Sequence, residues 1–320
     1  MIVAVTGGTG FIGRKLVQRL VARGDTVRVL SRSAVVSEQP SLVENYHCDL
    51  LSVPTKELTS MLEGVAVLYH CAGQLTNPQA MQALHVEATH KLVKAASGRV
   101  NHWVQLSSVG VYGPVKAGLI TEDSALNPVG RYEITKAESD KIVASGSKNG
   151  GFSHSILRPS NVFGAEMNNQ SLFKMVSVID KGWFFYIGKP GASANYIHVD
   201  NVVNGLICCG TMDAAKNGIF NLSDHCTLEQ FVGVITDTLG RPSPSLRMPE
   251  YIANFIGVTL GSLPGFPLTR SRVNALANYS SYPISRIQQA LGYTHTISME
   301  QGLRELVAEY QQRFSQRELK

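Results

Sequence analysis

Short apolar runs alternate with amphipathic segments through the first half of the chain. A run such as Val65–Cys71 is apolar at nearly every position, as strands buried on both faces are. A segment such as Arg14–Arg23 places its apolar side chains on one face of a helix. This alternation predicts a parallel sheet with helices on both sides. We expect strands at Ile2–Thr6, Thr26–Ser31, Val65–Cys71, His102–Ser107 and Ser153–Leu157, and helices at Arg14–Arg23, Met81–Ala96 and Tyr132–Ser145.

The pattern becomes more varied after Gly164. Tyr196–Val199 and Gly218–Leu222 are again typical of strands, and Met299–Gln312 is typical of a terminal amphipathic helix. We therefore expect a core domain of residues 1–165, to which residues 196–225 return. Residues 166–195 and 226–320 would form a smaller, partly interleaved C-terminal domain that binds the substrate. Within it, we expect the aromatic run Trp183–Tyr186 in the core rather than as a platform for stacking bases.

One stretch, from Tyr251 to Thr269, carries no charge. Glycines and prolines interrupt it, and a membrane span needs about 20 consecutive apolar residues. We expect a buried helix followed by a loop, with contact to a membrane surface as the alternative. The sequence thus predicts no membrane span.

Composition narrows the classes of partner. Hydrophobic residues make up 44% and charged residues 17% of the 320 positions, which is ordinary for a globular protein. The net charge of +5 comes without a Lys/Arg block, so we expect no nucleic-acid partner, although a mild positive field suits an anionic ligand. Five cysteines lack metal-site spacing, and the N-terminus lacks the basic start of a signal peptide. We expect free, mostly buried thiols in a cytoplasmic protein.

A glycine-rich turn connects the first expected strand to the first helix. Its first glycine permits a tight turn, its second lets the backbone approach a pyrophosphate, and its third lets the helix pack closely. The helix N-terminus adds unpaired N–H groups. The turn therefore predicts a Rossmann-type, doubly wound α/β fold that binds a dinucleotide. The residues expected to contact the cofactor here are Gly7, Thr9, Gly10, Phe11, Ile12 and Gly13.

The end of the second strand indicates which dinucleotide binds. An acidic residue there would accept a hydrogen bond from a ribose 2′-hydroxyl, but this chain has Ser31-Arg32. A guanidinium and a hydroxyl suit a 2′-phosphate, which favours NADP(H), with NAD(H) still possible. Asp49 and Leu50 follow a third expected strand, where Asp49 would reach the adenine. The alternatives are an exposed loop arginine and a plain loop aspartate.

Candidate catalytic groups follow. Tyr132 and Lys136 are four residues apart, so they share a helix face. An unperturbed tyrosine has a pKa of about 10, and a nearby cation lowers it by stabilising the phenolate. Ser107 and Ser108 end a strand where ligands of parallel sheets bind. We expect the Ser108 hydroxyl to polarise a carbonyl while Tyr132 transfers the proton. Ser107 is a cofactor contact or a structural strand-end hydroxyl.

Together these motifs resemble the extended short-chain dehydrogenases/reductases of the NAD-dependent epimerase/dehydratase type. The similarity covers nearly the whole chain. It rests on TGGTGFIG at Thr6–Gly13, Asp49, HCAG at His70–Gly73, SSVGVYG at Ser107–Gly113, Tyr132 with Lys136, RPSNVFG at Arg158–Gly164, and YIHVDN at Tyr196–Asn201. The resemblance implies that Ser108, Tyr132 and Lys136 form a catalytic triad.

The resemblance also implies roles for residues further along the chain. Ala72 and Gly73 would pass near the cofactor ribose, and Pro159 near the nicotinamide. In nucleotide-sugar members, the residues matching Asn161 and the region of Arg270 and Arg272 bind the diphosphate; an exposed pair at a helix start is the alternative for the two arginines.

Two features depart from the family's usual sequence, and a third residue is expected to have a structural role only. His85 replaces the usual asparagine and either supports the proton relay or only occupies a helix face. Val109-Gly110 stands where dehydratases and decarboxylases carry acids, which argues against both activities. His198 is expected to be structural.

The sequence therefore predicts an NADP(H)-dependent oxidoreductase or epimerase that acts on a nucleotide-linked sugar at a 4-keto/4-hydroxyl carbon. A carbonyl reductase resembling 3β-hydroxysteroid dehydrogenases or dihydroflavonol reductases is the alternative enzyme. A non-catalytic dinucleotide sensor is the alternative from another class. Helix-pair dimers are common in the family, so a homodimer is possible.

Overall fold

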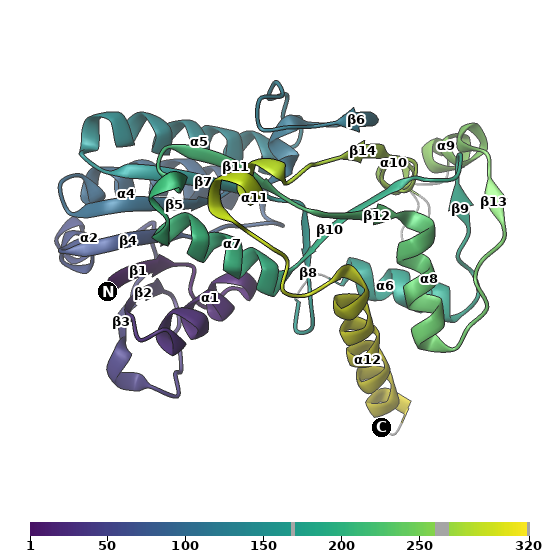
Figure 1. The fold of residues 1–320 in the computed structure, drawn as a ribbon, viewed down its shortest axis with the longest axis horizontal. Coiled ribbons are helices and arrows are strands. Elements are labelled where there is room, and N and C mark those ends of the chain that lie inside the picture. Colours follow the sequence, from purple (N-terminus) through teal and green to yellow (C-terminus); the bar gives the residue numbers. More distant parts are fainter. Residues whose placement is uncertain (168–169, 260–268, 319–320) are drawn as a thin grey trace.

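The computed structural model describes residues 1–167, 170–259 and 269–318. Its centre is a parallel sheet of seven strands in the order β11-β7-β5-β4-β1-β2-β3 (Figure 1). This order confirms the predicted Rossmann-type, doubly wound α/β class. The strands are β1 (Ile2–Thr6), β2 (Thr26–Ser31), β3 (Val43–His47), β4 (Val65–His70), β5 (Val100–Leu106), β7 (Ser153–Pro159) and β11 (Gly218–Leu222).

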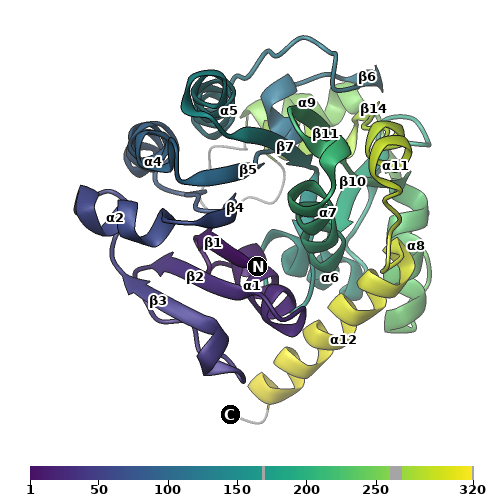
Figure 2. The same cartoon turned by 60° about the vertical axis from the view of Figure 1, so that its left-hand side comes forward.

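Side chains of β1 alternate between the two faces of the sheet, and each face has its own core. Val3 and Val5 pack in one cluster, which the helices α1 (Phe11–Ala22), α7 (Val199–Thr211) and α11 (Ser285–Leu291) complete. Ala4 packs in the other, with α2 (Thr55–Leu62), α4 (Ala88–Ala96) and α5 (Arg131–Gly150). Figure 2 shows these three helices together on one side of the sheet. The sheet is therefore covered on both faces, as the near-continuous apolar strands predicted.

The C-terminal part builds a second core around Phe231. The helices α6 (Ser171–Asp180), α8 (Leu228–Leu239) and α12 (Met299–Glu318) supply most of it. Three small sheets accompany them: β8 (Asn161–Phe163), β10 (Ser193–His198) and β12 (Asp224–Thr227); β9 (Tyr186–Ile187) with β13 (Arg247–Met248); and β6 (Ala117–Leu119) with β14 (Tyr279–Ser281). Because β11 pairs with β7, residues 218–222 rejoin the central sheet. The domain boundaries given above stay a prediction.

The helix expected at Met81–Ala96 is not a regular α-helix throughout. It consists of α3 (Pro78–Gln82), a π-helical turn η2 (Ala83–Glu87) and α4. The side chain of Asn77 caps α3 by accepting hydrogen bonds from two backbone N–H groups, which explains the start before Met81. A π turn carries one extra residue, so it shifts the helix face at His85.

Three expectations about burial are wrong in part. Trp183 is 71% exposed, although Phe184 and Tyr186 of the same aromatic run are buried. The helix expected to be buried, α9 (Glu250–Thr259), buries only Ala253 and Gly257; residues 260–268 of the uncharged stretch lie outside the described part. All five cysteines are free, but Cys209 alone is buried.

In the described part of the chain, no helix has both the length and the hydropathy needed to cross a bilayer.

Candidate active site

At two of its positions, the glycine turn lies too close to other backbone atoms to carry a side chain. Gly7 has a φ of +73°, and a Cβ there would lie 2.7 Å from the Cα of Ala72. A Cβ on Gly13 would lie 2.2 Å from the carbonyl oxygen of Gly7. The turn closes with a hydrogen bond from the Gly10 N–H to the Gly7 carbonyl (3.0 Å), and α1 begins at the next residue. Such a cradle fits a pyrophosphate at a helix N-terminus.

The contact between Gly7 and Ala72 also brings the segment Ala72–Gly73, which follows β4, against this turn. The carboxyl ends of β1 and β4 are therefore adjacent, as their parallel pairing requires. The family resemblance predicts that Ala72 and Gly73 pass near the cofactor ribose at this position.

Polar groups expected to read the adenosine end follow β2 and β3. The Arg32 side chain is exposed, and in the described chain it has no carboxylate partner. Ser31 is buried and donates its hydroxyl proton to the Ser33 carbonyl, so its expected role as a donor would need this bond to open. Asp49 accepts a hydrogen bond from the Leu51 N–H (2.9 Å), and Leu50 is buried. Arg32 is thus the best placed of these to meet a 2′-phosphate.

Tyr132 and Lys136 lie in the first turns of α5, as expected. Lys136 is buried, and its ammonium donates to the carbonyl of Leu106, the last residue of β5. Burial raises the pKa of Tyr132 to about 12, and the carboxylates of Glu133 and Asp140 add to this rise. The expected lowering of the Tyr132 pKa by Lys136 is therefore not seen in this structure, where burial dominates and the Lys136 ammonium is engaged by β5.

Ser108 caps a short 3₁₀ turn at the end of β5, where its Oγ accepts a hydrogen bond from the Gly110 N–H (3.1 Å). This bond occupies a lone pair and leaves the hydroxyl proton for another acceptor. Ser107 differs from its neighbour: it is buried and donates to Asp140 (2.8 Å). Its hydroxyl is therefore used within the fold, which favours the structural alternative.

Behind the triad lies a buried charge pair that sequence reasoning missed. Asp140, four residues after Lys136, accepts hydrogen bonds from Arg158 of β7 (3.2 and 3.3 Å). Both side chains are at most 4% exposed. Arg158 also donates to the Tyr112 hydroxyl (3.0 Å), which donates to Asn221 (2.8 Å). The repeat at positions 132, 136 and 140 was the available signal, since these residues share one face of α5.

His85 is buried beside Tyr132, with ring centroids 5.6 Å apart and an edge-on arrangement. Its Nε2 accepts from the Gln74 N–H (2.9 Å), so the proton of the neutral ring is on Nδ1, which faces Thr135 Oγ1 (2.8 Å). Burial, followed by the charge of Lys136, lowers the pKa of His85 to about 3. The ring therefore stays neutral and ties α5 to the loop after β4.

The remaining expected residues lie further from these contacts. Pro159 ends β7, and Asn161 is exposed on β8. Arg270 and Arg272 are exposed in the first turn of α10 (Arg270–Leu276), whose start lies against Gly257 of α9. His198 is buried and caps α7, consistent with the structural role expected for it.

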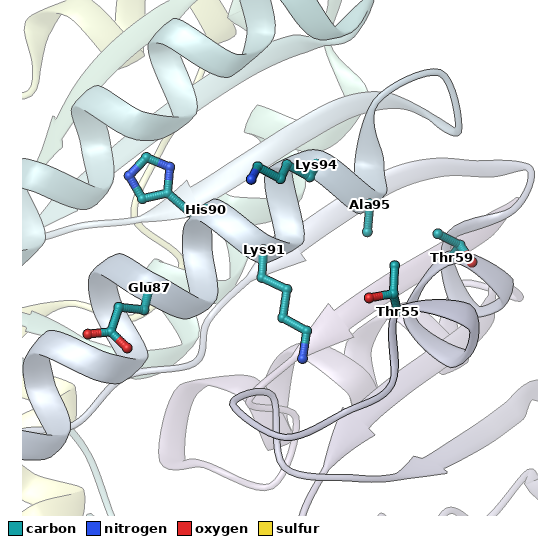
Figure 3. Close-up of a pocket in the computed structure, with 7 residues that line it drawn as sticks. All are labelled: Thr55, Thr59, Glu87, His90, Lys91, Lys94 and Ala95. Atoms are coloured by element: carbon teal, nitrogen blue, oxygen red, sulfur yellow. The ribbon is translucent and has the colours of Figure 1, made fainter.

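A cavity of about 310 Å³ between α2 and α4 contains none of the expected site residues. Figure 3 shows Lys91 reaching from α4 toward the segment before Thr55. The Lys91 ammonium donates to the carbonyls of Leu51 (3.3 Å) and Val53. Since its polar group is satisfied by the backbone, this hollow belongs to helix packing.

Residues 3–223 match the NAD dependent epimerase/dehydratase family. The chain belongs to this family. The match includes the glycine turn, Ser108, Tyr132 and Lys136, and it confirms the resemblance inferred from the motifs.

Relatives in this family act on different substrates. The chain is 26% identical over 323 residues to the 4-hydroxy-2-methyl-3-oxo-4-farnesyl-3,4-dihydroquinoline-1-oxide ketoreductase of Stigmatella aurantiaca, covering 93% of each chain. It is 25% identical to the UDP-glucose 4-epimerase of Vibrio cholerae, covering 95% of this chain and 93% of that one. UDP-glucuronic acid 4-epimerase from Bacillus cereus shares the fold, with a TM-score of 0.76, 17% identity, and coverage of 98% and 100%.

Proposed function

We propose that the protein is an NADP(H)-dependent oxidoreductase that interconverts a ketone and a secondary alcohol. One observation carries this proposal: a single edge of the sheet collects the glycine turn, Ala72 and Ser108. These follow β1, β4 and β5, and the ammonium of Lys136 reaches the end of β5 from α5. Ligands bind at this edge in doubly wound sheets.

The residues at this edge of the sheet would have different roles in binding the cofactor. Gly7, Gly10, Gly13 and the start of α1 would hold the pyrophosphate, and Arg32 the 2′-phosphate. The nicotinamide ring, when bound, supplies or accepts the hydride.

Ser108 donates a hydrogen bond from its free hydroxyl to the substrate oxygen and so polarises the carbonyl. Tyr132, which its raised pKa keeps protonated at neutral pH, then gives a proton to that oxygen as it becomes an alkoxide. Lys136 carries the positive charge that balances the phenolate left behind. Because the resting tyrosine is protonated, these groups suit reduction better than oxidation.

For the substrate, the structure favours an apolar ketone. The relative from Stigmatella aurantiaca is a ketoreductase of a farnesylated compound, and α9 presents a large apolar surface. Neither β8, which begins with the exposed Asn161, nor β10 contains a lysine or arginine to bind a diphosphate.

A nucleotide-linked sugar with a 4-keto group is the second candidate. It is supported by the UDP-glucose 4-epimerase relative and by two exposed arginines, Arg270 and Arg272. An epimerase would keep its cofactor through turnover, whereas a reductase would release it.

The test is NADPH oxidation with a panel that contains farnesylated and steroid ketones and 4-keto nucleotide sugars. We expect turnover of an apolar ketone and a KM for NADPH that rises about 10-fold or more in Arg32→Ala, because a charge-assisted contact is lost. The control is Arg99→Ala, which removes a guanidinium that pairs with Glu63. Turnover of nucleotide sugars alone would reverse the order of the two candidates, and no turnover with any carbonyl would refute the proposal.

A further inference from the structure

The helix α9 carries apolar residues on most of its sides, and Asn254 and Thr259 are its polar positions after Glu250. After Glu250, no charged residue occurs before Arg270. One face packs inward, where Ala253 is fully buried beside Ile187 and Val273. A helix that is apolar on most of its sides is normally enclosed by protein or lipid.

The opposite face of α9 has no cover in the described chain. Tyr251, Phe255 and Val258 are 74%, 71% and 62% exposed. Their spacing of four and three residues places them in one row along the helix. Contiguous apolar surface of this kind is kept for binding, since leaving it in water is unfavourable.

The same end of the molecule carries more exposed apolar side chains. Figure 1 shows α9 together with β9 and β13 at the right-hand end. Leu246, next to β13, is 66% exposed, and Trp183, before β9, is 71% exposed. The ammonium of Lys181 lies 5.6 Å from the centre of the Trp183 ring. A tryptophan beside a lysine is typical of side chains at a membrane–water boundary.

Two acidic side chains near this end are already paired, whereas Asp237 near the end of α8 is exposed. Glu250 binds Lys116 (3.1 Å), and Glu229 binds Arg247 (2.7 Å). By contrast, exposed cations keep no carboxylate partner among the described residues; these are Lys181, Lys189 and Arg270. The apolar row is thus accompanied by positive charge that the protein does not neutralise.

This combination identifies the occupant. Apolar and aromatic side chains that enter a bilayer's boundary region, flanked by cations that meet anionic headgroups, are the signature of interfacial helices. A symmetric pairing of two copies through α9 would instead bring like charges together. With 10 residues, α9 is far too short to span a bilayer, which takes about 20.

We propose that α9 docks the protein on an anionic lipid surface, inserting Tyr251, Phe255 and Val258 at the headgroup boundary. Arg270, which lies against Gly257 of α9, and Lys189, which follows the Gly188 that lies near Glu250, face the anionic headgroups. An enzyme held in this way would receive an apolar ketone from the membrane. The docking itself does not depend on the proposed reaction.

Flotation of the purified protein with vesicles tests the docking. Vesicles of phosphatidylcholine with a quarter phosphatidylglycerol should bind the protein, and added salt should weaken binding. The variant Tyr251→Ser/Phe255→Ser/Val258→Ser should bind roughly 10-fold less or weaker still. The matched control is Leu119→Ser, which removes a 73% exposed leucine from β6 and should bind as the unaltered protein does.

Several outcomes would overturn the proposal. The unaltered protein could fail to bind the vesicles, or the triple variant could bind them as well as the unaltered protein does. The unaltered protein could also form a concentration-dependent dimer that the triple variant does not form, with no binding of either protein to vesicles. Circular dichroism must show that the triple variant is folded; if it is not, the single variant Phe255→Ser, expected to bind several-fold less, replaces it. Tyr132→Phe separates the two proposals, because it should abolish turnover and leave flotation unchanged.

Discussion

The helices α5 and α9 depart from the usual division of polar and apolar residues in opposite directions. The inner face of α5 carries Lys136 and Asp140, both at most 4% exposed, whereas α9 turns Tyr251 and Phe255 toward solvent. Burying charge and exposing aromatic rings are both unfavourable for stability. Each departure therefore marks a place where the molecule gives up stability for binding or chemistry.

The two departures also differ in how the molecule compensates. In α5 both buried charges have a partner: Asp140 binds Arg158 and Ser107, and Lys136 binds the Leu106 carbonyl. In α9 the exposed row has none in the described chain. We infer that α5 is complete within the protein, while α9 is completed by an outside surface.

The largest effect is expected from Tyr132→Phe. Without the hydroxyl, no group donates the proton to the substrate oxygen, so kcat/KM should fall by about 10²- to 10⁴-fold. Steady-state NADPH oxidation measures this change. Tyr251→Phe removes the same atom from α9 and should leave kcat/KM for a water-soluble ketone unchanged. If kcat/KM fell equally in both variants, the difference proposed between α5 and α9 would be refuted.

The next effect is on stability. Asp140→Ala leaves Arg158 buried without its carboxylate, which should lower the free energy of unfolding by about 3–5 kcal/mol. Urea denaturation measures it. Asp213→Ala, which removes a 93% exposed aspartate paired with Lys216, should have no measurable effect. If the two variants unfolded at the same urea concentration, the buried pair would not anchor α5.

Acid should weaken the polar interior behind the site. Burial lowers the pKa of His70 to about 3, against about 6.5 when unfolded. Between these values the unfolded chain binds the proton that the folded chain excludes, so stability is full above pH 6.5 and falls as the pH drops.

From pH 7 to 5, His70 should account for a loss of roughly 2 kcal/mol, measured by urea denaturation at both values. His70→Gln should remove the share of this dependence that His70 contributes, and His90→Gln, which changes an exposed histidine, should leave the dependence unchanged. An unchanged slope in His70→Gln would contradict the assignment.

The smallest effect should come from the exposed face of α9. Phe255→Ser should change the free energy of unfolding by at most about 0.5 kcal/mol, because the ring makes little contact within the protein. Phe231→Ala, in the fully buried second core, should cost about 3–5 kcal/mol in the same thermal or urea assay. A large loss in Phe255→Ser would mean that the ring supports the fold instead of a surface.

The sequence predicted the central sheet well because its strands are buried on both faces. Ile2–Thr6, Thr26–Ser31 and Gly218–Leu222 occur with the expected bounds. The sequence predicted the burial of α9 wrongly, because a pattern of apolar residues does not show which neighbouring elements pack against a helix. The apolar residues of α9 recur on most sides, so periodicity could not show which side meets solvent.

Motifs in the sequence also pointed to the glycine turn, Ser108, Tyr132 and Lys136, since each depends on local spacing. The pairing of Asp140 with Arg158 joins two elements through the fold, and spacing does not reveal it. The orientation of His85 depends on the π turn η2, which ordinary helical periodicity does not predict.

The central claim is that this chain transfers hydride at a carbinol carbon with protonation by Tyr132. The most direct measurement follows deuterium from NADPH that carries deuterium at both C4 positions into the product of the most active ketone, by mass spectrometry. We expect one deuterium, bound to the new carbinol carbon, in product formed by the unaltered protein, and almost no product with Tyr132→Phe. Product without deuterium, or equal labelled product from Tyr132→Phe, would contradict it.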